Sequence, residues 1–162
     1  MRKKCHNQFI MERDNMTFKK ITNSDQDVLE YIEVEKTAIG DYTYSGIVDF
    51  NEAKKQIEEN ECFNIYEDDV LVGHGEYTMK NPNHAYLGGL VILPEFKSHG
   101  IGRKATLFML EMVKDIDRVD LVTHPHNTAV IRIFLSLGFR IESWKDNYWG
   151  DGQPRLVISK IK

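Results

Sequence analysis

A strand, a glycine-containing loop and a helix follow one another directly between Tyr86 and Ile116, and this joint constrains the fold more than any other part of the sequence. The apolar run "YLGGLVILP" predicts a buried strand that ends at Pro94. The stretch "EFKSHGIGRKA" comes next, and apolar residues then recur at helical intervals from Ala105 onward. The joint therefore predicts an α/β fold, with a sheet flanked by helices.

The same joint has the chemistry of an anion site. The first backbone N–H groups of a helix have no partner within the helix, and the helix dipole adds positive potential there. Gly100 and Gly102 lack Cβ atoms and would let a bulky anion approach the backbone closely. Nearby positive charge comes from Lys97, His99, Arg103 and Lys104. A pyrophosphate is the expected guest, and the alternative interpretation is a turn whose charges are solvated.

Two other phosphate-binding motifs fit the joint poorly. A Walker A loop needs G-x-x-x-x-G-K-[ST], and the sequence has no such string. "GIGRKA" has the spacing of the alanine variant of the dinucleotide fingerprint, which requires an early strand–helix–strand unit with an acid ending the next strand. Here the next strand, "VDLVTH", ends in Thr123 and His124. A nicotinamide cofactor is therefore not expected.

The rest of the chain predicts one domain over residues 16–162. We expect a strand at 16–21, helices that begin after Ser24 and Asp49, a hairpin turning at 67–69, the joint, a strand at 118–124, a helix from Asn127 to Gly138 and two final strands. The prediction is a mixed sheet of about six to seven strands flanked by about four helices. Residues 1–15 are polar and lack periodicity, which predicts a disordered leader, and Met11 or Met16 is an alternative natural start.

Composition excludes several classes of protein. The 162 residues carry a net charge of −4, which does not favour nucleic-acid binding, and no apolar run approaches the ~20 residues of a membrane span. The amino terminus lacks the apolar segment of a signal peptide, and Cys5 and Cys62 form no motif. A reduced, cytoplasmic protein is expected. His124 and His126 could suggest a metal pair, but no third ligand has suitable spacing, so no metal is expected.

Two motifs together resemble the GNAT superfamily of acetyl-CoA-dependent N-acetyltransferases. The family's pyrophosphate loop reads [RQ]-x-x-G-x-[GA], and "ILPEFKSHGIG" matches it with Lys97 in the first position. A second family signature reads N-x-x-A-x-x-x-Y-x-x-x-G-F, and "NTAVIRIFLSLGF" is similar to it from Asn127 to Phe139. The resemblance covers about residues 16–162 and implies the GNAT acyltransferase fold, in which two central parallel strands splay apart.

The resemblance also implies how acetyl-CoA binds as a co-substrate. Its pyrophosphate would rest on the backbone amides of Lys97, Ser98, His99, Gly100, Ile101 and Gly102, with Arg103 beside them. Its pantetheine arm would pair with the backbone of Leu90, Val91 and Ile92, on a strand that Gly88 and Gly89 suit for a bulge. Phe134 would contact the arm, and Asn127 would contact the pantetheine or the adenosine side, with a plain N-cap as a further role for Asn127.

The usual catalytic groups of the family do not transfer to this sequence. Phe134 stands where a tyrosine commonly protonates the leaving thiolate, and the two usual glutamate positions hold Gly89 and Val122. Substitutes are nominated from position: Glu76, Tyr148 and His124 first, with His74, Tyr86 and His126 nearby. The alternative for each is an ordinary solvated side chain.

The acceptor is expected to be a primary amine, either a protein N-terminus or a small-molecule amine. In the family, two loops wall the acceptor site, and here they carry Tyr42, Tyr44, Tyr148 and Trp149 with Asp41, Asp146 and Asp151. The aspartates also fit turn chemistry. The expected function is acetyl transfer by a monomer or homodimer without nucleic-acid or membrane partners. The alternative is a non-catalytic acetyl-CoA-binding sensor or partner module.

Overall fold

The computed structural model describes the backbone of residues 2–5, 8–13, 15–39 and 46–162, and side chains from residue 15 onward within those ranges. The strands are β1 (Arg2–Cys5), β2 (Gln8–Arg13), β3 (Met16–Lys20), β4 (Glu61–Glu67), β5 (Val70–Asn81), β6 (His84–Ile92), β7 (Arg118–Thr123), β8 (Arg140–Lys145) and β9 (Arg155–Ile161). The helices are α1 (Asp25–Lys36), α2 (Phe50–Glu59), α3 (Ile101–Met112) and α4 (Thr128–Ser136), with a 3₁₀ turn at Pro94–Phe96.

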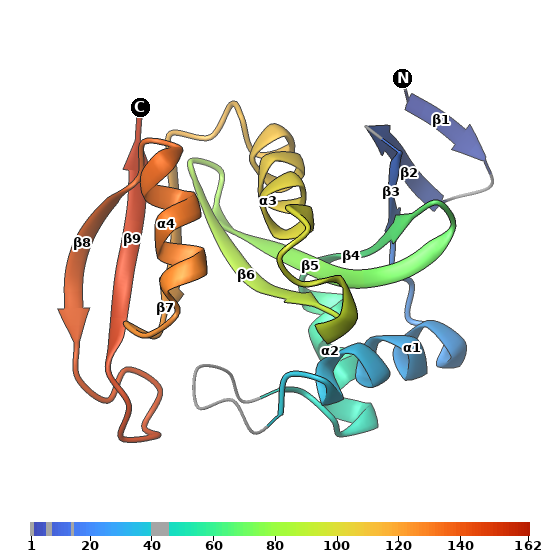
Figure 1. Ribbon diagram of the computed structural model, residues 1–162, viewed down its shortest axis with the longest axis horizontal. Coiled ribbons are helices and arrows are strands. Elements are labelled where there is room, and N and C mark those ends of the chain that lie inside the picture. Colours follow the sequence, from blue (N-terminus) through green and yellow to red (C-terminus); the bar gives the residue numbers. More distant parts are fainter. Residues whose placement is uncertain (1, 6–7, 14, 40–45) are drawn as a thin grey trace.

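The strands form one mixed sheet in the order β1-β2-β3-β4-β5-β6-β7-β9-β8 (Figure 1). Strands β3 to β9 and the four α-helices occur in the predicted order, which confirms the expected fold class. Among the described strands, only β6 and β7 pair in parallel, and the chain crosses between them through α3. A parallel pair needs such a crossover, which explains why the loop-to-helix joint lies there.

Two further strands extend the sheet within the segment for which the sequence predicts a disordered leader. Strand β1 pairs antiparallel with β2, and β2 pairs antiparallel with β3. An outer strand can add to an open sheet edge through backbone hydrogen bonds alone, so a segment without apolar periodicity can still pair there. The domain boundary at residue 16 stays a prediction.

The β6–β7 pairing is short, and beyond it the two strands diverge. Paired residues are His84 with Arg118, Ala85 with Val119 and Tyr86 with Asp120. Past Tyr86, β6 continues to Ile92 without pairing to β7, while β7 pairs with β9 along its whole length. We call this divergence the fork; it is visible between the two ribbons in Figure 1. The fork confirms the splayed parallel strands that the sequence resemblance implies.

A β-bulge lies just past the fork on β6. Gly75 pairs with Leu90 and Tyr77 pairs with Leu87, so Gly88 and Gly89 together face Glu76 on β5. A Cβ atom at Gly88 would lie 2.6 Å from Oε1 of Glu76, closer than real Cβ contacts allow. The bulge that "GG" predicts is present, and a side chain at its first position would displace the Glu76 side chain.

Helices cover the two faces of the sheet differently. The main core packs α3 and α4 on one face, through Phe108 and Phe134 against inward side chains such as Leu87 and Leu121. A second cluster packs α1 and α2 on the other face, around Val28, Tyr31, Ala53 and Ile57. Side chains alternate along a strand, so residues next to these inward positions on β6 and β7 face away from α3 and α4.

The predicted helix caps are confirmed at two of three positions. The side chains of Ser24 and Asp49 accept hydrogen bonds from the backbone N–H groups of Asp27 and Glu52. Asn127 occupies the N-cap of α4, but its side chain makes no capping bond, so that part of the prediction is wrong. Its backbone (φ −78°, ψ 65°) is not extended like that of the other two caps, which changes the direction of its side chain.

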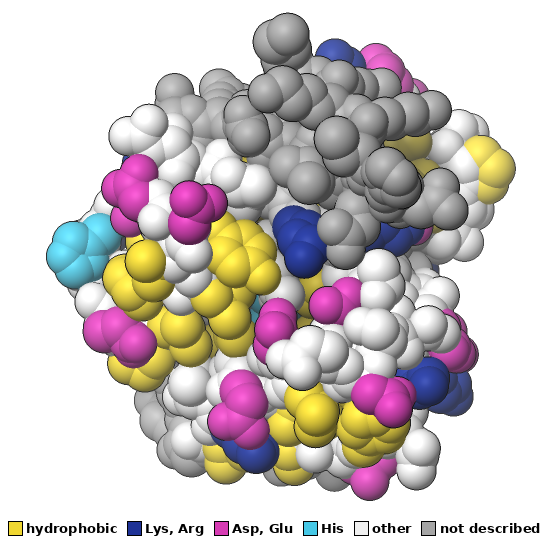
Figure 2. Space-filling model, turned by 90° about the vertical axis from the view of Figure 1, so that its right-hand side faces the viewer, with side chains coloured by type: hydrophobic (Ala, Val, Ile, Leu, Met, Phe, Trp, Pro, Cys, Tyr) yellow, Lys and Arg dark blue, Asp and Glu magenta, His cyan; other side chains and the backbone are white. Residues whose placement is uncertain are grey.

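The described surface is mixed in character. On the side shown in Figure 2, hydrophobic side chains gather in a patch that acidic side chains border. Within the described ranges, no helix combines the length and the apolar character needed to cross a membrane.

Candidate active site

The loop between β6 and α3 presents backbone N–H groups at a helix start. Gly100 is the N-cap of α3 and has a left-handed backbone, with φ +79°, and Ser98 is also left-handed, with φ +67°. The first helical bond runs from the N–H of Lys104 to the carbonyl of Gly100. The N–H groups of the three residues before Lys104 therefore have no partner within the helix. Left-handed residues in such a loop turn successive amides inward and make an anion-binding concavity.

The two glycines of this loop leave room that the protein does not fill. A Cβ atom at Gly100 would meet nothing within 4 Å, and one at Gly102 would meet only Cγ1 of Ile92, at 3.9 Å. Neither packing nor a positive φ requires glycine at position 102. A bound anion that needs close access to the amides explains a glycine at this position, so the residues present fit a pyrophosphate.

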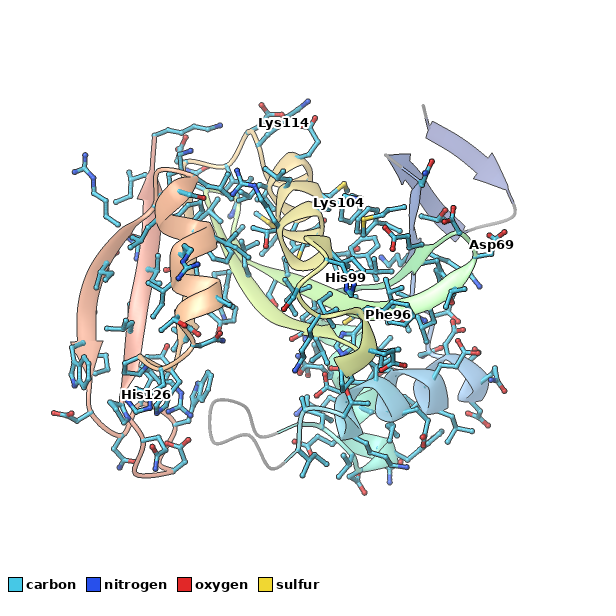
Figure 3. The ribbon with its side chains drawn as sticks, viewed as in Figure 1. Asp69, Phe96, His99, Lys104, Lys114 and His126 are labelled. Carbon is cyan, nitrogen blue, oxygen red and sulfur yellow. The ribbon has the colours of Figure 1, made fainter. Side chains whose placement is uncertain are left out.

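The charged side chains predicted beside the pyrophosphate lie at the surface. Lys97, His99 and Arg103 are exposed, and Figure 3 shows His99 at the start of α3. The guanidinium of Arg103 donates to Oγ of Ser136 at 2.8 Å. This bond ties the start of α3 to α4 and places a positive charge between the two helices.

The residues predicted to contact the pantetheine arm lie along one path. Leu90, Val91 and Ile92 are on β6 beyond the fork, where no β7 backbone pairs with them. Their unpaired side can accept an extended ligand like an added strand. Phe134 of α4 is only 4% exposed, and its ring packs edge-on against that of Phe139 with centroids 5.0 Å apart.

Glu76, nominated as a base, is enclosed by hydrogen-bond donors. Its Oε1 accepts from Nε2 of Gln56 at 2.8 Å and from the backbone N–H of Gly89 at 3.1 Å. Its Oε2 accepts from the hydroxyl of Tyr31 at 3.4 Å and the thiol of Cys62 at 3.5 Å. Burial and the Glu76 carboxylate raise the pKa of the Cys62 thiol far above its usual range, so the thiol remains a donor. A catalytic role for Glu76 stays a prediction.

His74 lies on the same strand face as Glu76, as predicted, and is also engaged. Its Nε2 lies 2.5 Å from Oε1 of Glu35, and both side chains are fully buried. The ring of Tyr31 packs against its ring with centroids 4.5 Å apart. The backbone N–H of Ile47 donates to the other oxygen of Glu35. This pair fixes α1 against β5.

His124, also nominated, is buried at the end of β7. Its Nδ1 accepts from the backbone N–H of His126 at 3.1 Å, and its Nε2 lies 3.3 Å from Oε1 of Gln153. Figure 3 shows His126 where β7 leads into α4, on the other flank of the fork from His99. Both ring nitrogens of His124 thus contact the protein, and its catalytic role stays a prediction.

A pocket of about 430 Å³ opens at the fork, on the face away from α3 and α4. We call it the fork pocket; its lining residues are Lys80, His84, Tyr86, Asp120, Val122, Tyr148, Trp149 and Val157. The rings of Tyr148 and Trp149 pack edge-on, with centroids 5.7 Å apart, and each side chain is about half exposed. Burial, followed by Tyr148, Glu76 and Asp120, raises the pKa of Tyr86 above its usual range, so its phenol stays protonated.

A charged cluster forms one wall of the fork pocket. Nε2 of His84 lies 2.9 Å from Oδ2 of Asp120. The guanidinium of Arg118 donates to the same Oδ2 at 3.0 and 3.2 Å and to Glu142 at 2.7 Å. Hydrogen bonds from Ser159 and Arg118 lower the pKa of Glu142. Sequence reasoning missed His84 and Asp120; the signal was a lone aspartate within the apolar strand "VDLV".

The remaining acceptor residues divide into two groups. Asp41, Tyr42 and Tyr44 lie outside the described residues. Asp151 accepts from the backbone N–H of Gln153 and from Arg155, and Asp146 accepts from the indole of Trp144; both are local contacts of turn residues. In the described part of the chain, no three histidine, cysteine or acidic side chains gather as metal ligands would.

Comparisons with known proteins agree with this geometry. The model of the acetyltransferase (GNAT) family matches residues 29–139, which include the fork, the glycine loop and α4. No curated protein matches the chain.

Solved structures share the fold at low sequence identity. The ribosomal-protein-S5-alanine acetyltransferase from Vibrio fischeri is 15% identical, with a TM-score of 0.72 over 94% of this chain and 96% of that one. The ribosomal-protein-S18-alanine N-acetyltransferase from Escherichia coli is 17% identical, with a TM-score of 0.71 over 90% and 93%. A ribosomal L7/L12 alpha-N-protein acetyltransferase is 16% identical, with a TM-score of 0.75 over 97% and 96%. With the family model matching more than half of the chain, and with the fork and glycine loop in place, this protein belongs to the GNAT acetyltransferase family.

Proposed function

We propose that this protein transfers the acetyl group of acetyl-CoA to a primary amine, either a protein N-terminus or a small-molecule amine. The observation that carries the proposal is the room at Gly100 and Gly102 beside unpaired amides, directly after a strand whose inner edge is open. Three similar structures are, by name, acetyltransferases of ribosomal proteins, which favours testing peptide N-termini among the acceptors.

The chain's own residues would divide the work between the two faces of the sheet. Bound acetyl-CoA supplies an acyl group activated as a thioester. The loop from Lys97 to Gly102 would hold the pyrophosphate, and β6 beyond the fork would orient the arm by backbone hydrogen bonds. With the pyrophosphate on the loop and the arm along β6, the thioester end would lie nearest the fork. The fork pocket, on the opposite face, would admit the amine.

A non-catalytic acetyl-CoA-binding module remains the second candidate. Phe134 has no hydroxyl to protonate a thiolate, and Gly89 and Val122 occupy the usual glutamate positions. Glu76, the buried carboxylate nearest the bulge, already accepts four hydrogen bonds. These observations favour a binder only if no other group in the pocket moves the proton.

One experiment separates the two candidates. Thiol release from acetyl-CoA is followed against a panel of amines that includes alanine-initiated peptides, polyamines and amino sugars. Calorimetry measures acetyl-CoA binding in parallel. Amine-dependent release supports the transferase, whereas binding without release for every amine supports the binder. Absence of acetyl-CoA binding would remove both candidates.

A further inference from the structure

The fork pocket meets the path of the cofactor arm at the point where β6 and β7 part. Tyr86 and Asp120 form the last pair between β6 and β7, and both line the pocket. Val122 of β7 lines the pocket beyond the fork, and the adjacent Leu121 packs in the core on the other face of the sheet. A group that enters the pocket therefore approaches the fork from the face opposite α3 and α4.

His84 lines this pocket, with Nε2 close to the Asp120 carboxylate but without a hydrogen-bond partner of its own. Its buried Nε2 lies 2.9 Å from Oδ2 of Asp120, although the pair lacks the angle of a good hydrogen bond. Its Nδ1 makes no hydrogen bond with the described residues, and it is not among their buried side-chain atoms that lack a partner. Catalytic hydrogen bonds are often poorly aligned before substrate binds and tighten in the complex.

The other nominated bases are less available than His84. Glu76 accepts four hydrogen bonds, and both ring nitrogens of His124 contact the protein. The raised pKa of Tyr86 keeps its phenol protonated, so it can donate but not accept a proton near neutral pH. Among the described histidines, His84 is the one that lines the fork pocket.

We propose that His84 accepts the proton of the acceptor amine and that Asp120 orients its ring; this inference rests on the proposed transferase function. The amine nitrogen forms a bond to the acyl carbon as the carbon–sulfur bond breaks, and sulfur takes that electron pair. The proton that nitrogen loses passes to Nδ1 of His84 and then to solvent. Arg118 donates twice to Oδ2 of Asp120 and holds that carboxylate in position, so His84 acts as the catalytic residue and Asp120 as the positioning residue.

Several charged or titratable groups face the pair from neighbouring elements. Lys80 of β5 lies over the ring of Tyr86, with Nζ 5.0 Å from the centroid. Arg118 and Asp120 come from β7, Glu142 from β8 and Tyr148 from the loop before β9. The charges of Lys80 and Arg118 are matched in number by those of Asp120 and Glu142, so the groups around the pair carry both signs.

The test uses His84→Gln in the full-length protein, with the best amine of the panel. We expect kcat/KM to fall about 10²-fold while acetyl-CoA affinity stays unchanged. In the wild type, kcat/KM should depend on pH more steeply than in His84→Gln, because the variant keeps only the rise that follows the neutral fraction of the acceptor amine. In His84→Ala, added imidazole should restore part of the activity. Asn83→Ala is the matched control, because Asn83 is adjacent and exposed.

A second readout does not depend on turnover. Diethyl pyrocarbonate modifies neutral imidazoles, and mass spectrometry of the peptide that contains His84 measures the rate. The acetylated product of the best amine should slow this modification, because it would occupy the fork pocket. Equal activity of His84→Gln and wild type, or equal modification with and without product, would overturn the role of His84 but not the proposed transferase function. Failure of the wild type with every amine would overturn the proposed function and this inference together.

Discussion

The backbone N–H of Gly89 donates to Oε1 of Glu76 at 3.1 Å, so a side chain of β5 holds the β-bulge of the neighbouring strand β6. Bulges free a backbone group from the ladder, and here a carboxylate takes up that group. Gln56 of α2 donates to the same oxygen at 2.8 Å. The relationship links the covering helix, the bulge and the inner edge of β6 in one hydrogen-bonded unit.

Glu76→Gln is expected to lower the free energy of unfolding by about 1–3 kcal/mol, because the amide group turns a donor toward donors and leaves at least one unpaired. Urea denaturation measures the change. Glu33→Gln, which alters an exposed partner of Lys36, serves as the control and should change stability by less than about 1 kcal/mol. Full stability with lost turnover would instead establish Glu76 as a catalytic base.

Gly102→Ala should weaken acetyl-CoA binding by at least about tenfold without destabilising the protein. The new Cβ has room against Ile92, and alanine is the better helix former. It would, however, occupy space next to the unpaired amides. Calorimetry and thermal unfolding measure the two effects separately. Unchanged affinity in this variant would remove the pyrophosphate from the loop.

Gly100→Ala should also lose affinity, but with a backbone cost, since Gly100 has φ +79°. Gly152→Ala is the matched control: Gly152 has φ +74°, and a Cβ atom there also meets nothing within 4 Å. The two variants share the strain of a left-handed alanine, about 1 kcal/mol. Only Gly100→Ala should change the affinity for acetyl-CoA. Equal affinities of the two variants would contradict the placement of the pyrophosphate on the loop from Lys97 to Gly102.

The order of elements could be predicted because its signals are local. Ser24 and Asp49 cap the helices that follow them, and Gly138 has the left-handed backbone expected after α4. The fork itself was available only through the family resemblance, since no local pattern states where two parallel strands stop pairing. Strands β1 and β2 were missed because edge pairing needs no apolar alternation.

Phe134→Tyr is expected to raise kcat about tenfold if the family arrangement holds, because the added hydroxyl could protonate the leaving sulfur. The gain is small for a general acid because a thiolate already leaves readily. Stopped-flow thiol release with saturating amine measures the change. A lower or equal kcat would place the ring away from the sulfur.

Phe134→Tyr should also change how much acetyl-CoA stabilises the folded protein. Phe134 is 4% exposed, so a new hydroxyl lacks a partner until the cofactor arrives, and acetyl-CoA should stabilise Phe134→Tyr more than the wild type. Phe139→Tyr is the control, because Phe139 is 3% exposed and packs against Phe134. Its loss of stability should be the same with and without acetyl-CoA.

The buried thiol of Cys62 should make the free energy of unfolding fall as the pH rises above 9.0. Burial raises the pKa of its thiol in the folded state, so the native protein holds this proton after the unfolded chain has released it. The contribution is complete below the ordinary thiol pKa of 9.0 and is lost as pH rises above it, by up to about 1.4 kcal/mol per pH unit. Urea denaturation at pH 8 and 10 tests this. Cys62→Ser keeps a donor for Glu76 and should show a smaller loss; parallel losses would exclude Cys62 as the source.

The charged wall of the fork pocket lay beyond sequence reasoning for a definite physical cause. His84 and Asp120 meet because β6 and β7 pair in a parallel register that places Tyr86 opposite Asp120. A shift of one strand by one residue would turn one of the two side chains to the opposite face and separate the pair. Glu76, by contrast, was correctly placed on its strand, but its donors come from α1, α2 and β4, which local sequence does not position.

The fork adds two inner edges to the two outer edges of the sheet. Over residues 87–92 of β6 and 121–123 of β7, the facing backbone groups have no strand partner across the fork. Open strand edges attract the strands of other chains, and proteins ordinarily blunt them with charge, proline or cover. In this protein the cover would be the cofactor itself, so the form without acetyl-CoA is expected to self-associate more readily on storage. Keeping the purified protein saturated with CoA should preserve it as a dispersed species.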